Sequence, residues 1–319
     1  MKRRRFLQAT VAGAGAAHIG CTGPSLPGGP AGKSAVAILK VASYSADLTS
    51  LLRRGAELCG LAARGKRVLL KPNLVEFDSS TAINTHVAVI AAAVELFRHL
   101  GAAEILIGEG PGHRRDTLYL AEEAGYRRGI ERFEASFVDL NRDDVSSAGR
   151  FAGVDTLWLP KAALGADLVV SLAKMKTHHW ACATLSMKNL FGVVPGSLYG
   201  WPKNLLHRIG IHRSITELHR LFPHSFAIVD GIVGMEGNGP IQGRPKPSGA
   251  IVMGHDLVAV DATCCRIMGI DPARVEYLRL TAARGHARED RIEQRGEPLS
   301  AVETDFELIP EFRDCRLSR

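Results

Sequence analysis

Short apolar runs alternate with helical patterns from Ala35 onward, and this alternation limits the folds open to the chain. Several runs are apolar at consecutive positions, which is typical of strands covered on both faces. Strand–helix–strand repetition predicts an α/β fold, with a mostly parallel sheet and helices on both faces. The expected strands are Val36–Val41, Val68–Leu70, Ile105–Ile107, Ser136–Leu140, Leu168–Leu172, Phe226–Val229 and Ala250–Met253. The expected helices are Leu48–Ala62, Thr85–Leu100, Thr117–Ala124, His207–Leu221 and Val258–Met268.

The body of the chain has no long internal linker, so we expect a single α/β domain over 35–319. A chain of 319 residues is long enough for one large domain or two. The Gly- and Pro-rich stretch Gly231–Gly249 fits either a loop over the functional site or a join to a smaller second subdomain.

The first 20 residues resemble a twin-arginine signal peptide. Arg3 and Arg4 precede Phe6 and Leu7, and the weakly apolar stretch Ala9–Gly20 follows. A membrane-spanning helix needs about 20 apolar residues, so this stretch is not an anchor. Proteins exported by this route cross the membrane folded, so we expect folding and any cofactor loading in the cytoplasm. The alternative is a disordered basic tail.

Residues 21–34 follow as a Pro- and Gly-rich tether. His18–Cys21 is similar to a lipoprotein box, which predicts lipidation of Cys21; ordinary cleavage after the Ala-rich run is the alternative. No later segment has 18 consecutive apolar residues, so we expect the rest to be soluble. The predicted location is periplasmic or otherwise extracytoplasmic. The membrane contact would be a lipid on Cys21, and the export machinery would be a partner.

The net charge of +7 is weak evidence for a nucleic-acid partner, because Lys2–Arg5 carries four of the positive charges and the balance without them is +3. Aromatic residues make up 6% and do not alternate with basic runs, so we expect no nucleic acid. The six cysteines match no metal or redox spacing, so no iron–sulfur cluster is expected. Cys59, Cys264 and Cys265 are interpreted as buried thiols.

Polar and glycine residues follow several expected strands, where ligands bind in open parallel sheets. The central segments of this kind are Lys174–His179 and Ser186–Gly196, with support from Lys71–Leu74, Gly108–Gly112, Asp230-Gly231, Glu236–Pro240 and Asp261. Together they resemble the domain of unknown function 362 family, and the similarity runs from about Val36 to Met268. Some members of that family carry a ferredoxin-like module, whose cysteine spacing this chain lacks, and the resemblance implies no settled reaction.

The central block predicts an anion site. Beyond a strand ending near Leu172, the side chains of Lys174, Lys176 and His178 would point to one side. Clustered ammonium groups persist best with an anion between them, so a carboxylate or phosphate is expected; the alternative is a solvated basic edge. The remaining anion-binding candidates are Lys71, Asn73, Lys188 and Asn189. Lys71 and Asn73 also fit an ordinary strand exit.

Two residues are candidate catalytic groups. His178 titrates near neutral pH, and Glu109 is a carboxylate at a strand end, so either could move a proton. Asp230, Glu236 and Asp261, with His178 or His255, are candidate ligands of a divalent metal. For Asp261 a helix cap or buried ion pair is the alternative. His207, His212, His219 and His224 are interpreted as surface or cleft-wall residues.

The sequence therefore predicts an exported enzyme that acts on a small anionic substrate in a basic cleft. Two other functions stay open: a non-catalytic anion-binding lipoprotein, and a cofactor-handling or maturation factor.

Overall fold

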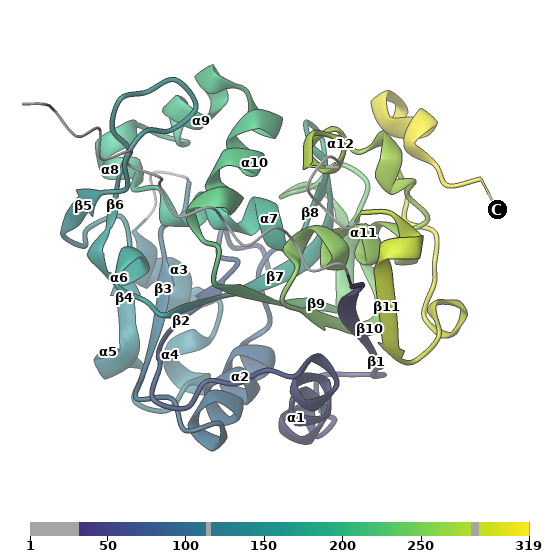
Figure 1. Ribbon diagram of the computed structural model, residues 1–319, viewed down its shortest axis with the longest axis horizontal. Coiled ribbons are helices and arrows are strands. Elements are labelled where there is room, and N and C mark those ends of the chain that lie inside the picture. The colour runs from purple at the N-terminus through teal and green to yellow at the C-terminus, as the bar shows by residue number, and fades with distance from the viewer. Residues whose placement is uncertain (1–31, 113–115, 282–286, 319) are drawn as a thin grey trace, which may run out of the picture. The chain divides into compact units, whose positions relative to one another are not determined.

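A mixed, mostly parallel sheet forms the centre of the protein (Figure 1). The computed structural model describes residues 32–112, 116–281 and 287–318. Within them nine strands pair in the order β11-β1-β10-β9-β7-β2-β3-β4, and β8 pairs with β7. Strands β9, β7, β2, β3 and β4 are mutually parallel, and β10 runs antiparallel to β9 and β1. The strands are β1 Ser34–Lys40, β2 Arg67–Pro72, β3 Glu104–Glu109, β4 Phe137–Asp139, β7 Leu168–His178, β8 Cys182–Thr184, β9 Ser225–Glu236, β10 Arg244–Gly254 and β11 Ile292–Gly296. A separate pair consists of β5 Val145–Ser147 and β6 Trp158–Pro160.

Helices cover both faces of this sheet, as the sequence predicts. One buried cluster joins the sheet to α1–α5, and a second joins its other face to α6, α7 and α9–α12. The α-helices are α1 Leu48–Cys59, α2 Val87–His99, α3 Thr117–Glu123, α4 Tyr126–Gly129, α5 Phe133–Ser136, α6 Lys161–Leu164, α7 Ser186–Asn189, α8 Gly196–Tyr199, α9 Asn204–Ile209, α10 Ile211–Leu221, α11 Leu257–Ile267 and α12 Glu276–Thr281. The 3-10 helices are η1 Leu190–Val193, η2 Pro272–Arg274, η3 Glu289–Arg291, η4 Leu299–Ala301 and η5 Pro310–Cys315.

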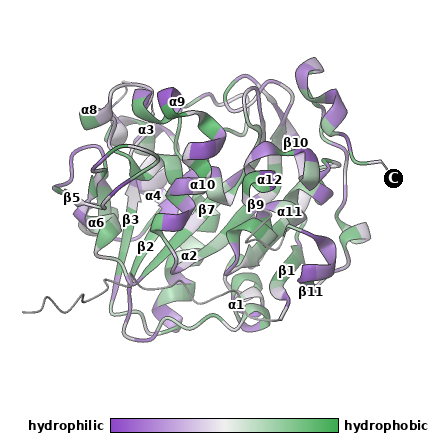
Figure 2. Cartoon of the chain, turned by 45° about the horizontal axis from the view of Figure 1, so that its top comes forward, coloured by the Kyte–Doolittle hydropathy of each residue, from purple (hydrophilic) through white to green (hydrophobic). Residues whose placement is uncertain are grey.

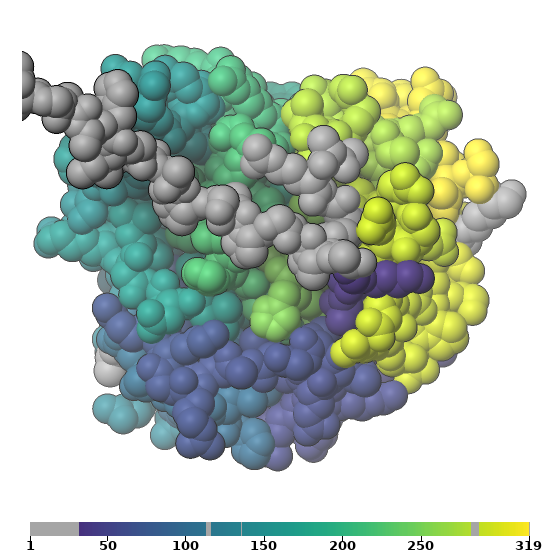
Figure 3. Space-filling model, in the orientation of Figure 1, coloured from purple at the N-terminus to yellow at the C-terminus, as the bar shows by residue number. Residues whose placement is uncertain are grey.

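The hydropathy of the chain follows this layering. Apolar residues concentrate along the central strands, and polar residues lie on the outer faces of helices such as α10 (Figure 2). The C-terminal part of the chain returns to its beginning, because β11 pairs in parallel with β1. In the space-filling view the purple start of the described chain therefore lies against residues of the yellow C-terminal part (Figure 3). Predictions that concern 1–31, including the signal peptide and Cys21, lie outside the described residues.

Strands β7, β9 and β10 are longer than the sequence-based expectation, and two stretches are organised differently. Most of the stretch Gly231–Gly249 forms the ends of β9 and β10, which pair from Ala227↔Gly254 out to Glu236↔Arg244, so it is not a subdomain join. The part that is a loop, as one of the two expectations had it, is the 237–243 turn between these strands. Their ladder satisfies the backbone polar groups in spite of the glycines and prolines. The expected helix His207–Leu221 is divided into α9 and α10 at Gly210, whose φ of 103° is open to glycine and strained for other residues.

Candidate functional site

A cavity of about 360 Å³ lies where β2, β3 and β7 deliver polar side chains. This is the edge at which open parallel sheets bind ligands. The 237–243 turn between β9 and β10 and the segment from Pro202 to His207 complete its wall. Among the described residues that line it there are four lysines and one carboxylate. The lysines are Lys71, Lys176, Lys188 and Lys203, and the carboxylate is that of Glu109.

Lys71 and Glu109 form a buried ion pair at the floor of the cavity. The Lys71 Nζ lies 2.5 Å from Glu109 Oε2, and each side chain is at most 2% exposed. Glu109 also accepts hydrogen bonds from the backbone N–H groups of Leu74 and Gly110, at 3.1 and 2.9 Å. Burial lowers the pKa of Lys71, and the Glu109 charge opposes that shift. With its oxygens occupied in this way, Glu109 fits a structural anchor better than the proton-moving role expected from sequence.

The Lys71–Glu109 ion pair requires a glycine at position 192. A Cβ on Gly192 would lie 2.0 Å from Glu109 Oε1 and 2.5 Å from Lys71 Nζ. The η1 backbone can therefore approach the ion pair only because Gly192 lacks a side chain. Asn189, in the preceding turn, accepts from Lys71 Nζ at 3.2 Å and donates to the Lys71 carbonyl at 2.9 Å.

Lys176 belongs to β7, which runs beyond the expected end at Leu172 because it keeps pairing with β8 and β9. Its Nζ donates to Asn73 Oδ1 at 2.7 Å, to the Ile83 carbonyl at 2.8 Å and to the Pro240 carbonyl at 3.4 Å. Burial, and then the charges of Lys188 and Lys174, lower the pKa of Lys176 well below its usual range. All three donor positions of Lys176 are used within the protein, so Lys176 and Asn73 join the cavity wall to neighbouring loops.

Lys188 differs from the other cavity lysines. In the described part of the chain no oxygen accepts a hydrogen bond from its Nζ, which lies 4.5 Å from the centre of the Phe191 ring. Burial, reinforced by the Lys71 charge, lowers the pKa of Lys188 to about 8. The Lys188 side chain is thus half-buried, and its ammonium group has no carboxylate partner among the described residues.

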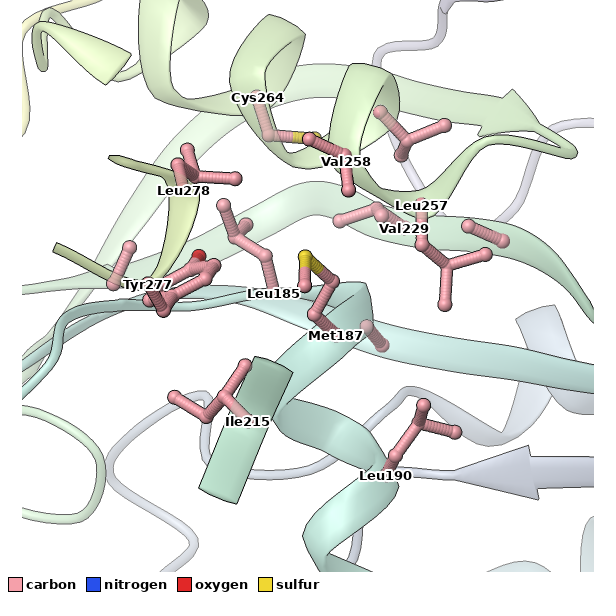
Figure 4. Packing of buried hydrophobic residues seen from close by; sticks show 14 of the residues in the cluster. Leu185, Met187, Leu190, Ile215, Val229, Leu257, Val258, Cys264, Tyr277 and Leu278 are labelled. Carbon is pink, nitrogen blue, oxygen red and sulfur yellow. The ribbon is translucent and has the colours of Figure 1, made fainter. Parts of the chain in front are cut away.

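Packing fixes the segment that carries Lys188. Met187 and Leu190 lie on either side of it and belong to the buried cluster with Ile215 and Leu257 (Figure 4). Asp261 of α11 accepts from the backbone N–H of Ser186 at 2.8 Å and that of Met187 at 3.1 Å. Burial raises the pKa of Asp261 to about 7. Asp261 therefore holds the start of α7 in place.

His178 presents an N–H group to the cavity. Its Nδ1 accepts from the backbone N–H groups of Trp180 and Ala181, at 2.9 and 3.2 Å, so the ring hydrogen lies on Nε2. Burial and the nearby Lys188 charge lower the pKa of His178 far below neutral. His178 is therefore a neutral hydrogen-bond donor. The sequence-based expectation that it moves a proton near neutral pH does not fit these contacts.

His179 has the opposite arrangement. Its Nδ1 lies 2.7 Å from the Gly239 carbonyl, which can only accept, so Nδ1 carries the hydrogen and Nε2 keeps a lone pair. Trp180 packs edge-on against His179 and against His207, at 4.7 and 5.3 Å between ring centres. Burial lowers the pKa of His207, which lines the same cavity.

Two further cavity residues carry chemistry that the sequence patterns do not indicate. Thr184 is 4% exposed, and its Oγ1 has no hydrogen-bond partner among the described residues. Lys203 donates to Val194 O and to Asn141 Oδ1, and burial lowers its pKa to about 7. Lys203 follows no strand, so the rule that located the other lysines could not have found it.

The other predicted site residues lie outside the cavity lining. Lys174 donates to Asp230 at 2.9 Å and to the Tyr44 hydroxyl at 2.8 Å, in a buried ion pair that is separate from the lining residues. Glu236 lies 3.6 Å from Arg244 and 3.4 Å from Lys246. His255 packs edge-on against Phe226, 4.8 Å between ring centres.

The predicted metal site is not assembled. Asp230, Glu236 and Asp261 each have separate partners, and no group of three His, Cys, Asp or Glu side chains suited to a metal occurs in the described ranges. Five of the cysteines lie in those ranges, and all five are buried free thiols, as expected for Cys59, Cys264 and Cys265. A search of the described residues found no helix long and apolar enough to cross a membrane.

Among solved structures, the lactate racemase apoprotein from Thermoanaerobacterium thermosaccharolyticum is similar, with a TM-score of 0.48 and 15% identity over 75% of this chain. A protein from Thermotoga maritima matches with a TM-score of 0.41 and 14% identity over 68% of this chain. The chain spans 57% of the length of each of these two structures.

Closer similarity appears in sequence. The thylakoid-associated protein sll1697 of Synechocystis sp. is 30% identical over 256 residues, which cover 75% of this chain and 76% of that protein. Residues 68–266 match the family described as a domain of unknown function (DUF362), and the match spans the strands and loops that build the cavity. The chain therefore belongs to the DUF362 family.

Proposed function

We propose that the cavity binds a small anion, a carboxylate or a phosphate, and that the protein is an enzyme acting on it. The observation that carries this proposal is the Lys188 ammonium, which lines the cavity, is half-buried and has no anionic partner among the described residues. A half-buried cation of this kind gains from an anionic ligand that supplies the missing charge. The volume of about 360 Å³ suits a small molecule.

Two uncharged groups support the same assignment. The Thr184 hydroxyl is buried without a partner, and the Nε2–H of His178 is a donor with no acceptor among the described residues. Buried polar groups are normally paired, so the Thr184 hydroxyl favours a polar ligand in the cavity, and the His178 N–H can donate to the same ligand. Together with Lys188 they offer one charged and two neutral donors to the oxygens of an anion.

His179 is the residue best suited to move a proton. Its backbone contact leaves the Nε2 lone pair free. By contrast, backbone N–H groups already donate to the Nδ1 lone pair of His178 and to the carboxylate of Glu109. A neutral imidazole can take a proton from the carbon next to a carboxylate when a donor stabilises the resulting charge. In this proposal His178 supplies that donor.

Calorimetry with acetate, butyrate, 2-hydroxybutyrate, phosphate and simple phosphate esters tests binding. For any ligand that binds, NMR in deuterated water tests proton removal, and His179→Gln should abolish exchange without abolishing binding. Binding without exchange or turnover would favour the non-catalytic anion-binding function. An absence of binding throughout would contradict the proposal.

The N-terminal motif supports a second proposal, that the protein is exported. Arg3 and Arg4 precede Phe6-Leu7 and a weakly apolar stretch, and a relative is named as thylakoid-associated. Replacing Arg3 and Arg4 together by lysine should leave precursor in the cytoplasm, and labelling with radioactive palmitate should reveal whether Cys21 carries a lipid. Unchanged export of the double variant would contradict the twin-arginine route.

A further inference from the structure

Lys188 combines three properties that set it apart from the other lysines that line the cavity. Its Nζ is the one cavity ammonium group without a hydrogen-bond acceptor among the described residues, it faces an aromatic ring, and it lines the cavity. Lys71 is paired with a carboxylate, and Lys176 and Lys203 donate to carbonyl or amide oxygens. Only Lys188 therefore has an amine that can be offered to a ligand atom.

We infer that Lys188 is a nucleophile that forms an imine with the carbonyl carbon of a small 2-oxo carboxylate bound in the cavity. The inference rests on the proposed anion site and names its substrate class.

The environment of Lys188 favours the reactive form of the amine. An amine attacks only when neutral, and lysines used in this way lie in desolvated sites or beside another cation. Burial and the Lys71 charge bring the pKa of Lys188 to about 8, so a useful fraction is neutral at neutral pH. No carboxylate among the described residues holds the ammonium in its charged state.

The remaining donors fit the other half of such a ligand. A 2-oxo carboxylate places its carboxylate on the carbon next to the carbonyl. The Thr184 hydroxyl and the His178 Nε2–H, both without acceptors in the described part of the chain, are available for its oxygens. The buried ring of Phe191 lies against the amine and shields that side of it from water.

The step balances without a further reactant. The neutral Lys188 Nζ attacks the carbonyl carbon, and one C–N bond forms as the carbon–oxygen π bond opens to a carbinolamine. The carbinolamine then loses water, which takes the carbonyl oxygen together with the two hydrogens that the amine gives up. A C=N bond remains, and nothing is oxidised or reduced. The His179 Nε2 lone pair is available to pass a proton from nitrogen to the departing oxygen.

Borohydride trapping tests this inference. The purified protein is incubated at pH 8 with 2-oxobutyrate or with butyrate, which differs in lacking the carbonyl, and is then reduced. The expected result is one adduct per chain with 2-oxobutyrate, mapped by peptide mass to Lys188, and none with butyrate. Calorimetry should also give 2-oxobutyrate an affinity about tenfold above that of butyrate.

Two variants complete the experiment. Lys188→Arg keeps the charge and cannot form an imine, so it should bind butyrate within about threefold of wild type and give no adduct. Lys188→Met is a second variant, which keeps the test valid if the arginine variant misfolds. Its melting temperature is measured, and it should also give no adduct. Lys40→Arg, on the exposed face of β1, should behave as wild type.

The outcomes separate this inference from the proposed function. If both acids bind wild type equally and borohydride traps nothing, the imine is wrong and the anion site stands. If neither acid binds and no adduct forms, both are wrong. An adduct that persists in Lys188→Arg, or that spreads over surface lysines, would also overturn the imine.

Discussion

His178 and His179 are neighbours whose rings lie 4.8 Å apart, yet their backbone contacts fix opposite tautomers. Two amide N–H groups donate to His178 Nδ1, whereas His179 Nδ1 donates to the Gly239 carbonyl. One ring therefore offers a hydrogen and the other a lone pair. In the proposed function, this pair would supply the donor and the base that proton transfer at a bound anion requires.

Nitrogen NMR of the histidine rings should detect these two tautomers directly. We expect the His178 hydrogen on Nε2 and the His179 hydrogen on Nδ1. Because burial and the Lys188 charge lower the pKa of His178 far below neutral, its signals should not titrate between pH 8 and 5. A His178 ring that gains a proton within that range would contradict the assignment of its role.

Lys188→Met should stabilise the protein at neutral pH. Burial lowers the pKa of Lys188 from 10.5 to about 8, so between these values the unfolded chain binds more protons than the folded chain. The free energy of unfolding of wild type should therefore rise with pH across that window, relative to Lys188→Met. Denaturant titrations at pH 7 and 10 measure this difference.

Lys176→Met is the matched comparison, since it removes an ammonium group from the same cavity. It leaves Asn73 Oδ1 and the Ile83 carbonyl without their donor, which costs about 1–3 kcal/mol for each buried acceptor. A lower melting temperature is expected for Lys176→Met and not for Lys188→Met. If Lys188→Met lowered the melting temperature and Lys176→Met did not, the prediction that Lys188 is the lysine without hydrogen-bond acceptors would be contradicted.

Glu109→Gln should destabilise the protein strongly. Removing one member of a buried ion pair costs about 3–5 kcal/mol, because the Lys71 charge is left uncompensated. The control lies on the same two strands: Arg67 and Glu104 are 2.7 Å apart but about half exposed, so Glu104→Gln should cost under about 1 kcal/mol. If urea unfolding showed the same loss of unfolding free energy for Glu109→Gln and Glu104→Gln, burial of the Lys71–Glu109 pair would have no energetic consequence.

Gly192→Ala should disrupt the same ion pair sterically. The new Cβ would lie within 2.5 Å of both Glu109 Oε1 and Lys71 Nζ, and overpacking of this kind costs about 1–3 kcal/mol. Gly112→Ala adds the same methyl to the cavity wall with its nearest neighbours at 3.8 Å, so it should unfold near the wild-type temperature. Thermal unfolding followed by circular dichroism distinguishes the two variants.

The layered α/β fold was predictable because apolar runs mark strands whatever they pair with. The end of β7 was not, because Lys174 and Lys176 interrupt the apolar run after Leu172. Their charges are tolerated inside the sheet through Asp230 and through the carbonyl of Ile83. Such partners are distant in sequence, and hydropathy carries no information about them.

The location of the candidate site in the fold was predictable from the sequence, but the contacts of its side chains were not. Lys71, Glu109, Lys176 and His178 line one cavity because β2, β3 and β7 deliver their carboxyl ends to one edge, and α7 places Lys188 in the same lining. Which of these side chains is free to meet a ligand depends on hydrogen bonds that only the folded chain defines. The same limit applies to the predicted metal ligands. Asp230 and Glu236 pair with different cations, and Asp261 accepts from backbone N–H groups, so the three carboxylates do not form one site.

The central claim is that Lys188 provides the charge that binds an anion, and calorimetry tests it most directly. Butyrate and phosphate are titrated into wild type, Lys188→Met and the exposed control Lys40→Met at pH 7 and pH 9. For the anion that binds, Lys188→Met should lose about 10- to 150-fold in affinity, the equivalent of roughly 1.5–3 kcal/mol for a charge-assisted hydrogen bond. Wild-type affinity should also fall by up to about tenfold per pH unit above a pH of about 8, as Lys188 loses its proton, and the Lys188→Met variant should lack that decline. Equal affinities in wild type and a folded Lys188→Met variant at pH 7 would contradict the account.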